Sequence, residues 1–99
     1  MELTGPLCRA GRALVQWPRR RLAEACGVTK NAIRDFESAN VDPGPQVRAQ
    51  LKQLLEQGGA VFIPEDSMGA GVRLRHTQKE VGALTRLEGE GGRAGEDDV

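Results

Sequence analysis

Four polar residues in the first half of the chain have side chains whose chemistry suits reading DNA bases. Lys30 and Arg34 can donate hydrogen bonds to guanine O6 and N7, and Asn31 can pair with adenine N6 and N7. Thr29, just before them, suits contact with a phosphate or a thymine methyl group. Three consecutive basic residues upstream can neutralise phosphates; they are Arg19, Arg20 and Arg21. A basic triplet can equally be the solvated start of a helix, so its role depends on the fold around it.

Two short helices, over residues 19–26 and 30–37, are predicted to carry these side chains. In both segments apolar residues recur at helical spacing. Gly27 suits the left-handed conformation that ends a helix, and Thr29 can cap the next one. The apolar positions are Leu22, Ala23 and Cys26 in the first helix, and Ala32, Ile33 and Phe36 in the second. On the second helix the four polar residues then share the exposed side.

The spacing within this segment predicts a helix-turn-helix. Two short helices that cross steeply touch near their middles, so a small residue is needed there, and Ala23 supplies it. Gly27 lies in the turn, four residues later. Apolar residues must anchor the unit to the rest of the domain; those available are Leu22, Val28, Ile33 and Phe36. In such a unit the second helix directs its N-terminal polar residues into the major groove.

The segment LAEACGVTKNAIRDFE, residues 22–37, resembles the LA…GV(S/T)…I…(I/F)E signature of Cro/repressor-type (XRE-like) transcriptional regulators. LLEQGGAVFIPEDSMGAGVRLR, residues 54–75, is similar to a motif of a short subgroup that adds a C-terminal β-hairpin. The resemblance covers about residues 3–75. It departs from the family where Pro18 and Arg19 replace Ser or Thr followed by Gln. That Gln often contacts a phosphate, which Arg19 can reach as a charge.

The resemblance implies a mainly α fold with a four-helix domain over residues 1–75. The Gly-rich, acidic composition at the end of the chain predicts a flexible, disordered tail over residues 76–99. Two further helices and a hairpin are predicted from apolar spacing and turn residues. Their ranges are 5–15 and 45–57 for the helices, and 60–63 and 71–75 for the strands. A lone hairpin is marginally stable, so it must pack on helix 45–57 or on a second subunit. Residues 77–87 can form a weak helix. Glu37 matches a family position concerned with internal hydrogen bonding.

Helix 5–15 is predicted to begin after Thr4, whose hydroxyl can cap it. Arg9 and Arg12 are expected on its solvent side. That expectation follows from the apolar positions, which are Leu7, Ala10, Leu14 and Val15, with Cys8 beside them.

The two cysteines, Cys8 and Cys26, are expected to be buried and reduced, with a disulfide between them as the alternative. The chain has no CxxC pair and one histidine, so a zinc site is not expected. No catalytic residue, metal or cofactor is predicted. An enzyme is the third-ranked class of function, since the sequence shows no nucleophile elbow and no metal cluster.

A net charge of zero conceals an uneven distribution. Residues 1–57 hold nine basic and six acidic residues, whereas residues 58–99 hold five basic and eight acidic ones. A basic first half favours a surface that meets nucleic acid. No apolar run reaches the roughly 20 residues needed to cross a bilayer, and no signal peptide is recognised, so a cytoplasmic protein is expected.

Two functions follow as hypotheses. The first is a sequence-specific regulator that binds double-stranded DNA as a homodimer, because one helix-turn-helix reads only a few base pairs. Its dimer surface would be the hairpin or the apolar side of helix 45–57. The second is a protein-binding module on the same fold that antagonises another regulatory protein.

Overall fold

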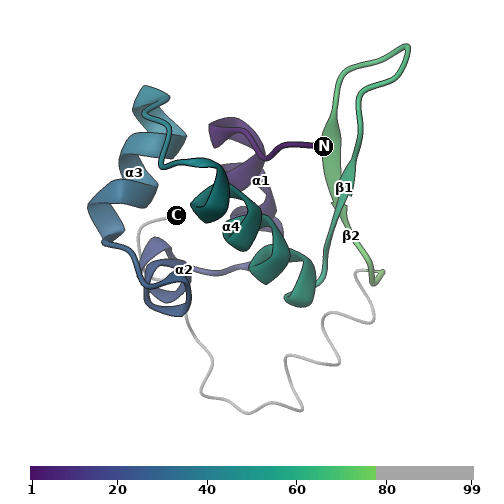
Figure 1. Cartoon of the computed structure of the whole chain (residues 1–99). Coiled ribbons are helices and arrows are strands. Elements are labelled where there is room, and N and C mark those ends of the chain that lie inside the picture. Colours follow the sequence, from purple (N-terminus) through teal and green to yellow (C-terminus); the bar gives the residue numbers. More distant parts are fainter. Residues whose placement is uncertain (78–99) are drawn as a thin grey trace.

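The computed structural model describes residues 1–77, which form four helices followed by a two-stranded antiparallel hairpin (Figure 1). The fold is mainly helical, as the sequence predicted. The helices are α1 (Gly5–Val15), α2 (Arg19–Cys26), α3 (Lys30–Ala39) and α4 (Pro45–Gln57), and the strands are β1 (Ala60–Ile63) and β2 (Gly71–Leu74). The weak helix expected over 77–87 and nearly all of the tail expected over 76–99 lie outside the described residues.

Local capping signals set most of the helix boundaries. The hydroxyl of Thr4 accepts a hydrogen bond from the Leu7 N–H at 3.2 Å, and that of Thr29 accepts one from the Ala32 N–H at 3.0 Å. Gly27 ends α2 in the left-handed conformation, with φ 78°. Helix α3 runs two residues beyond its predicted end at 37, because the left-handed stop residue is Asn40, with φ 55°.

The hairpin packs against α1 and α4 of the same chain (Figure 1). Phe62 pairs with Val72 in the register, and Ala60 pairs with Leu74. Ala60 and Phe62 are buried in the core, whereas Ile63 on the other face of β1 is exposed. The side of the hairpin that faces the helices therefore completes the core, and packing on a second subunit is not needed to bury it.

The inner face of α1 differs from the prediction, and Arg12 is the main correction. Arg12 was expected in solvent but is 0% exposed, while Ala10, expected on the apolar face, is exposed. The buried positions of α1 are Gly5, Cys8, Gly11 and Arg12. They follow helical spacing, so small residues bring this face close to its neighbours. Arg9 is exposed, as predicted.

The apolar side of α4 is used inside the chain. Leu51 and Leu55 are both 0% exposed, and Val47 and Leu54 pack against the same core. This corrects the idea that the apolar side of α4 offers a dimer surface, because those side chains already have neighbours. In the described part of the chain, no helix combines the length and the apolar character needed to span a bilayer.

Candidate nucleic-acid interface

Helices α2 and α3 pack against each other around a small residue and a tight turn. Ala23 is 3% exposed, and its carbonyl accepts hydrogen bonds from the N–H groups of Gly27 at 2.9 Å and Val28 at 3.1 Å. Leu22 and Ile33 lie in the core beside it. The turn is thus held by the backbone, and it fixes where α3 begins relative to α2.

One long side of α3 is polar and exposed. Thr29, Lys30, Asn31 and Arg34 are all exposed, as the sequence predicted, and the first three cluster at the start of the helix. The opposite side is buried in the core; it consists of Ile33, Phe36 and Glu37. The structure therefore brings the four predicted base-contacting side chains onto one surface.

The three arginines of α2 do not share one environment. Arg20 and Arg21 are exposed, and the Arg21 guanidinium lies 4.3 Å from the centre of the Trp17 ring. Arg19 is half-buried, and its Nε donates a hydrogen bond to Glu37 Oε1 at 3.2 Å. Arg19 thus ties the start of α2 to α3, and its contact with phosphate stays a prediction.

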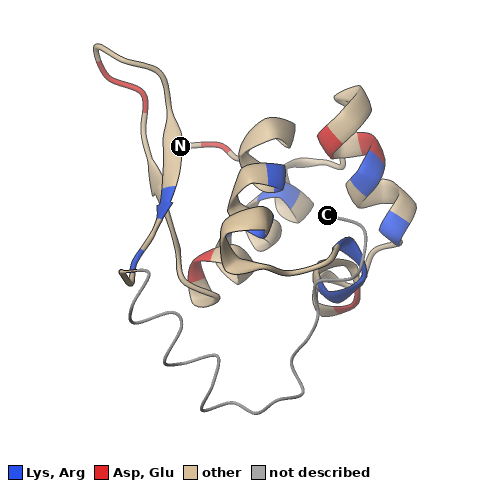
Figure 2. Ribbon diagram, turned by 180° about the vertical axis from the view of Figure 1, so that it is seen from behind, with Lys and Arg blue, Asp and Glu red and all other residues tan. Residues whose placement is uncertain are grey.

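The basic residues of α2 and α3 lie on the part of the ribbon at one end of the molecule, with the hairpin at the other end (Figure 2). The exposed basic residues of α2 and α3 are Arg20, Arg21, Lys30 and Arg34. We call these four residues the cationic surface. Asp35 lies beside it and forms an ion pair with Arg34 at 3.3 Å. A pair this exposed holds Arg34 weakly, so its guanidinium can turn to another acceptor.

A buried ion pair lies directly behind this surface. Arg12 Nη2 and Nε donate to Glu37 Oε1 at 2.8 Å and to Oε2 at 3.0 Å, and Arg12 Nη1 donates to the Trp17 carbonyl at 3.1 Å. Both side chains are 0% exposed. Two parallel hydrogen bonds to one carboxylate fix its orientation strongly. Glu37 therefore joins α1, α2 and α3, which confirms its predicted internal role.

The burial of Arg12 was not predicted, because the inner face of the helix was placed on Leu7, Ala10, Leu14 and Val15. A different signal was available, since Gly5, Cys8 and Gly11 are small residues at spacings of three. Small residues at that spacing mark a face of close approach, and Arg12 lies on it.

Both cysteines are free thiols in the core. Burial raises the pKa of the Cys8 thiol, and the negative charge of Glu37 raises it further. The Cys8 thiol donates a hydrogen bond to Glu37 Oε2 at 3.2 Å. Burial also raises the pKa of Cys26. Within residues 1–77 no three His, Cys, Asp or Glu side chains are grouped as a metal site would require.

The raised thiol pKa values predict a loss of stability at alkaline pH. Above the ordinary thiol value of 9.0 the unfolded chain releases these protons while the folded chain keeps them. The contribution of the raised thiol pKa values to stability is therefore fully present below that pH and falls as pH rises, by up to about 1.4 kcal/mol per pH unit for Cys8. Urea unfolding between about pH 8 and 10 measures this slope. Cys8→Ala should make it shallower; an unchanged slope would contradict the prediction.

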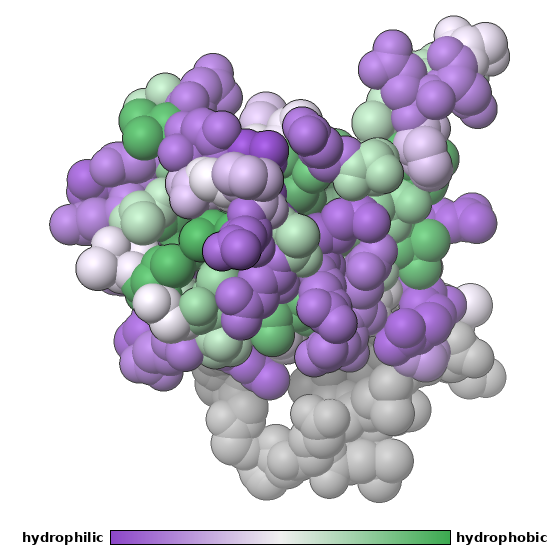
Figure 3. Space-filling model, in the orientation of Figure 1, coloured by the Kyte–Doolittle hydropathy of each residue, from purple (hydrophilic) through white to green (hydrophobic). Residues whose placement is uncertain are grey.

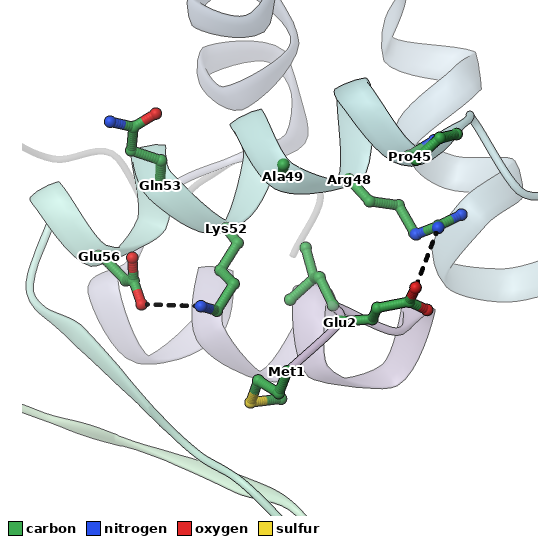
Figure 4. A pocket seen from close by; sticks show the side chains of 9 residues that line it. Met1, Glu2, Pro45, Arg48, Ala49, Lys52, Gln53 and Glu56 are labelled. Atoms are coloured by element: carbon green, nitrogen blue, oxygen red, sulfur yellow. Dashed lines mark ion pairs between the residues drawn. The ribbon is translucent and has the colours of Figure 1, made fainter.

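A cavity of about 380 Å³ opens between the N-terminal segment and α4 (Figure 4). Its charged side chains pair with each other, Arg48 with Glu2 at 3.6 Å and Lys52 with Glu56 at 3.4 Å. The remaining lining holds no nucleophile next to a base. This cavity therefore offers no chemistry that competes with the cationic surface as the functional site.

No protein-family model and no curated protein match this chain. The cationic surface is therefore judged on its own geometry and chemistry.

Proposed function

We propose that this protein is a transcriptional regulator that binds double-stranded DNA in a sequence-specific manner. In this proposal α2 and α3 form a helix-turn-helix like that of the Cro/repressor-type regulators, and α3 enters the major groove. One observation carries it: the N-cap Thr29 and the N-terminal half of α3 with Lys30, Asn31 and Arg34 are exposed, while the opposite side of the helix is anchored in the core. A helix that contacts DNA bases needs both a polar, exposed face and a rigid attachment to the rest of the domain.

The contacts follow from the chemistry of each side chain. Lys30 and Arg34 suit guanine, and Asn31 suits adenine. The hydroxyl oxygen of Thr29 accepts the capping hydrogen bond, so its O–H remains to donate to a phosphate. Arg20 and Arg21 on α2 would neutralise phosphates beside the groove. Arg19 would add to them only if it turns away from Glu37.

The proposed regulator acts as a homodimer that reads two half-sites. The hairpin is the surface we propose for the contact between copies, because its outer side exposes Ile63 at 39% and its loop exposes Met68 at 75%. Apolar surface also shows along the strands, below the polar tip of the hairpin (Figure 3). Since the hairpin lies opposite the cationic surface (Figure 2), contact there leaves both reading helices uncovered.

Binding of a Lys30→Ala/Arg34→Ala variant tests the proposal. We expect the double variant to lose roughly a hundredfold in affinity, since each specific base contact contributes about 1–3 kcal/mol. Fluorescence anisotropy measures this on an operator selected from random duplexes. The matched control is Arg9→Ala/Lys52→Ala, which removes the same charge from an exposed position on α1 and a half-buried one on α4, outside both the cationic surface and the hairpin. It should change affinity by less than about threefold.

Equal losses in the two variants would show that only net charge matters, and would refute a reading role for α3. The same titrations at high concentration give the stoichiometry. Two chains per duplex are expected, and one chain per duplex would exclude the homodimer.

The second candidate is a protein-binding antagonist of another regulator. The ion pair between Arg34 and Asp35 favours it, since Asp35 places a negative charge beside the proposed reading face. Such a protein would keep its activity after Lys30→Glu/Arg34→Glu, whereas a DNA binder would lose it. If selection from random duplexes yields no bound sequence, this candidate takes first place.

A further inference from the structure

The chain divides into a basic part and an acidic part. Residues 1–77 hold eleven basic and eight acidic residues, and residues 78–99 hold three basic and six acidic ones. Five of those six lie within residues 88–99, which contain a single arginine. We call residues 88–99 the acidic segment. Its carboxylates carry the same sign of charge as DNA phosphates, so both are attracted to the same kind of surface.

The cationic surface is the part of the described structure that best matches such a segment. Arg20 and Arg21 from α2 and Lys30 and Arg34 from α3 are exposed. The basic stretches of these two helices lie at the end of the molecule away from the hairpin (Figure 2). Elsewhere in the described structure, Arg12 and Arg19 both pair with Glu37, Arg48 pairs with Glu2 and Asp42, and the hairpin exposes two arginines, Arg73 and Arg75. Asp35 on α3 forms an ion pair with Arg34 of this surface.

The chain is long enough to bring the two together. The acidic segment begins eleven residues after Thr77, and an extended chain of that length spans at most about 40 Å. The longest dimension of the molecule is 36 Å. Residues 88–99 can therefore reach the cationic surface from the hairpin end.

We propose that the acidic segment docks on the cationic surface of its own chain and competes there with DNA. The inference rests in part on the proposed function, since the competition has meaning only if this surface binds DNA. Docking itself does not depend on DNA. Docking of the acidic segment would weaken binding to non-specific DNA. Operators would still bind, because their additional base contacts can displace the segment.

A Glu96→Gln/Asp97→Asn/Asp98→Asn variant of the full chain tests docking without DNA. Comparison of ¹H–¹⁵N NMR spectra should show shifts of backbone amides at the N-terminal halves of α2 and α3. These shifts should shrink as salt rises from about 0.05 to 0.5 M, because exposed ion pairs are screened. Spectra that change only next to the substitutions would overturn the proposal, whatever the protein does with DNA.

DNA binding by the same variant tests competition. We expect affinity for random duplex DNA at low salt to rise roughly fivefold, as for the loss of a few exposed ion pairs. A Glu2→Gln/Asp42→Asn/Glu56→Gln control removes an equal charge from exposed or half-buried positions on the N-terminal segment, the loop between α3 and α4, and α4. It should raise affinity less than about twofold.

An equal gain in the two variants would mean that net charge alone acts, and would overturn competition at this surface. Amide shifts on α2 and α3 in a protein that binds no DNA would support docking while removing the proposed function. The two ideas can therefore fail separately.

Discussion

Replacing Glu37 with alanine is expected to lower the free energy of unfolding by about 3–5 kcal/mol. The substitution leaves the guanidinium of Arg12 fully buried without its carboxylate, and it removes the bonds from Arg19 and Cys8 as well. A buried charge that loses its partner keeps its desolvation penalty and gains nothing in return. Urea unfolding followed by the fluorescence of Trp17, the one tryptophan of the chain, measures the change.

An apolar replacement of the pair separates the charge effect from loss of packing. Arg12→Met/Glu37→Met removes both buried charges at similar volume, and such replacements are often neutral or stabilising. We expect it to recover most of the stability that Glu37→Ala loses. If Glu37→Ala lowers the free energy of unfolding by less than about 1 kcal/mol, the ion pair does not hold α1, α2 and α3 together as its geometry indicates.

Glu37→Ala also bears on the cationic surface, because Arg19 at the start of α2 is tied to Glu37. Loss of the bond to Glu37 would free the positive charge of Arg19 for DNA, which favours binding, and would also loosen the start of α2, which opposes it. DNA affinity measured well below the unfolding temperature would show which of the two effects prevails.

The second substitution with a large expected effect is Gly5→Ala, which should lower the free energy of unfolding by about 3 kcal/mol. A Cβ at this position would lie 2.2 Å from the carbonyl oxygen of Phe36 and 3.2 Å from Cα of Glu37. Both are backbone atoms, so relief requires α1 and α3 to move apart. Alanine is a better helix former than glycine by about 1 kcal/mol, and the clash outweighs that gain. Thermal and urea unfolding measure the difference.

Gly69→Ala in the hairpin loop is the matched control. No heavy atom lies within 4 Å of its Cβ position, so a change within about 0.5 kcal/mol is expected. If Gly5→Ala were as well tolerated as Gly69→Ala, the close approach of α1 to α3 would be disproved. If Gly5→Ala destabilises the protein as expected, the packing position of α3 depends on a glycine that lies far from the exposed side of that helix.

The sequence by itself determined the elements that depend on near neighbours. Thr4 and Thr29 cap helices through groups three residues away, and Gly27 ends α2 through its own backbone freedom. The exposed face of α3 was also predictable, because Ile33 and Phe36 place it by helical spacing alone. The resemblance of residues 22–37 to a known signature indicated the internal role of Glu37, which the structure confirms.

Only the tertiary structure decided which charged groups are buried and which remain exposed. Arg12 lies 25 residues from Glu37 in the sequence, so no local pattern pairs them. The helical spacing of the apolar residues Leu7, Ala10, Leu14 and Val15 predicted Arg12 in solvent. Arg19 and its two neighbours look alike in the sequence, yet only Arg19 contacts Glu37 among the described bonds. Burial of an arginine depends on a carboxylate brought near by folding, because an unpaired charge in the core is too unfavourable to persist.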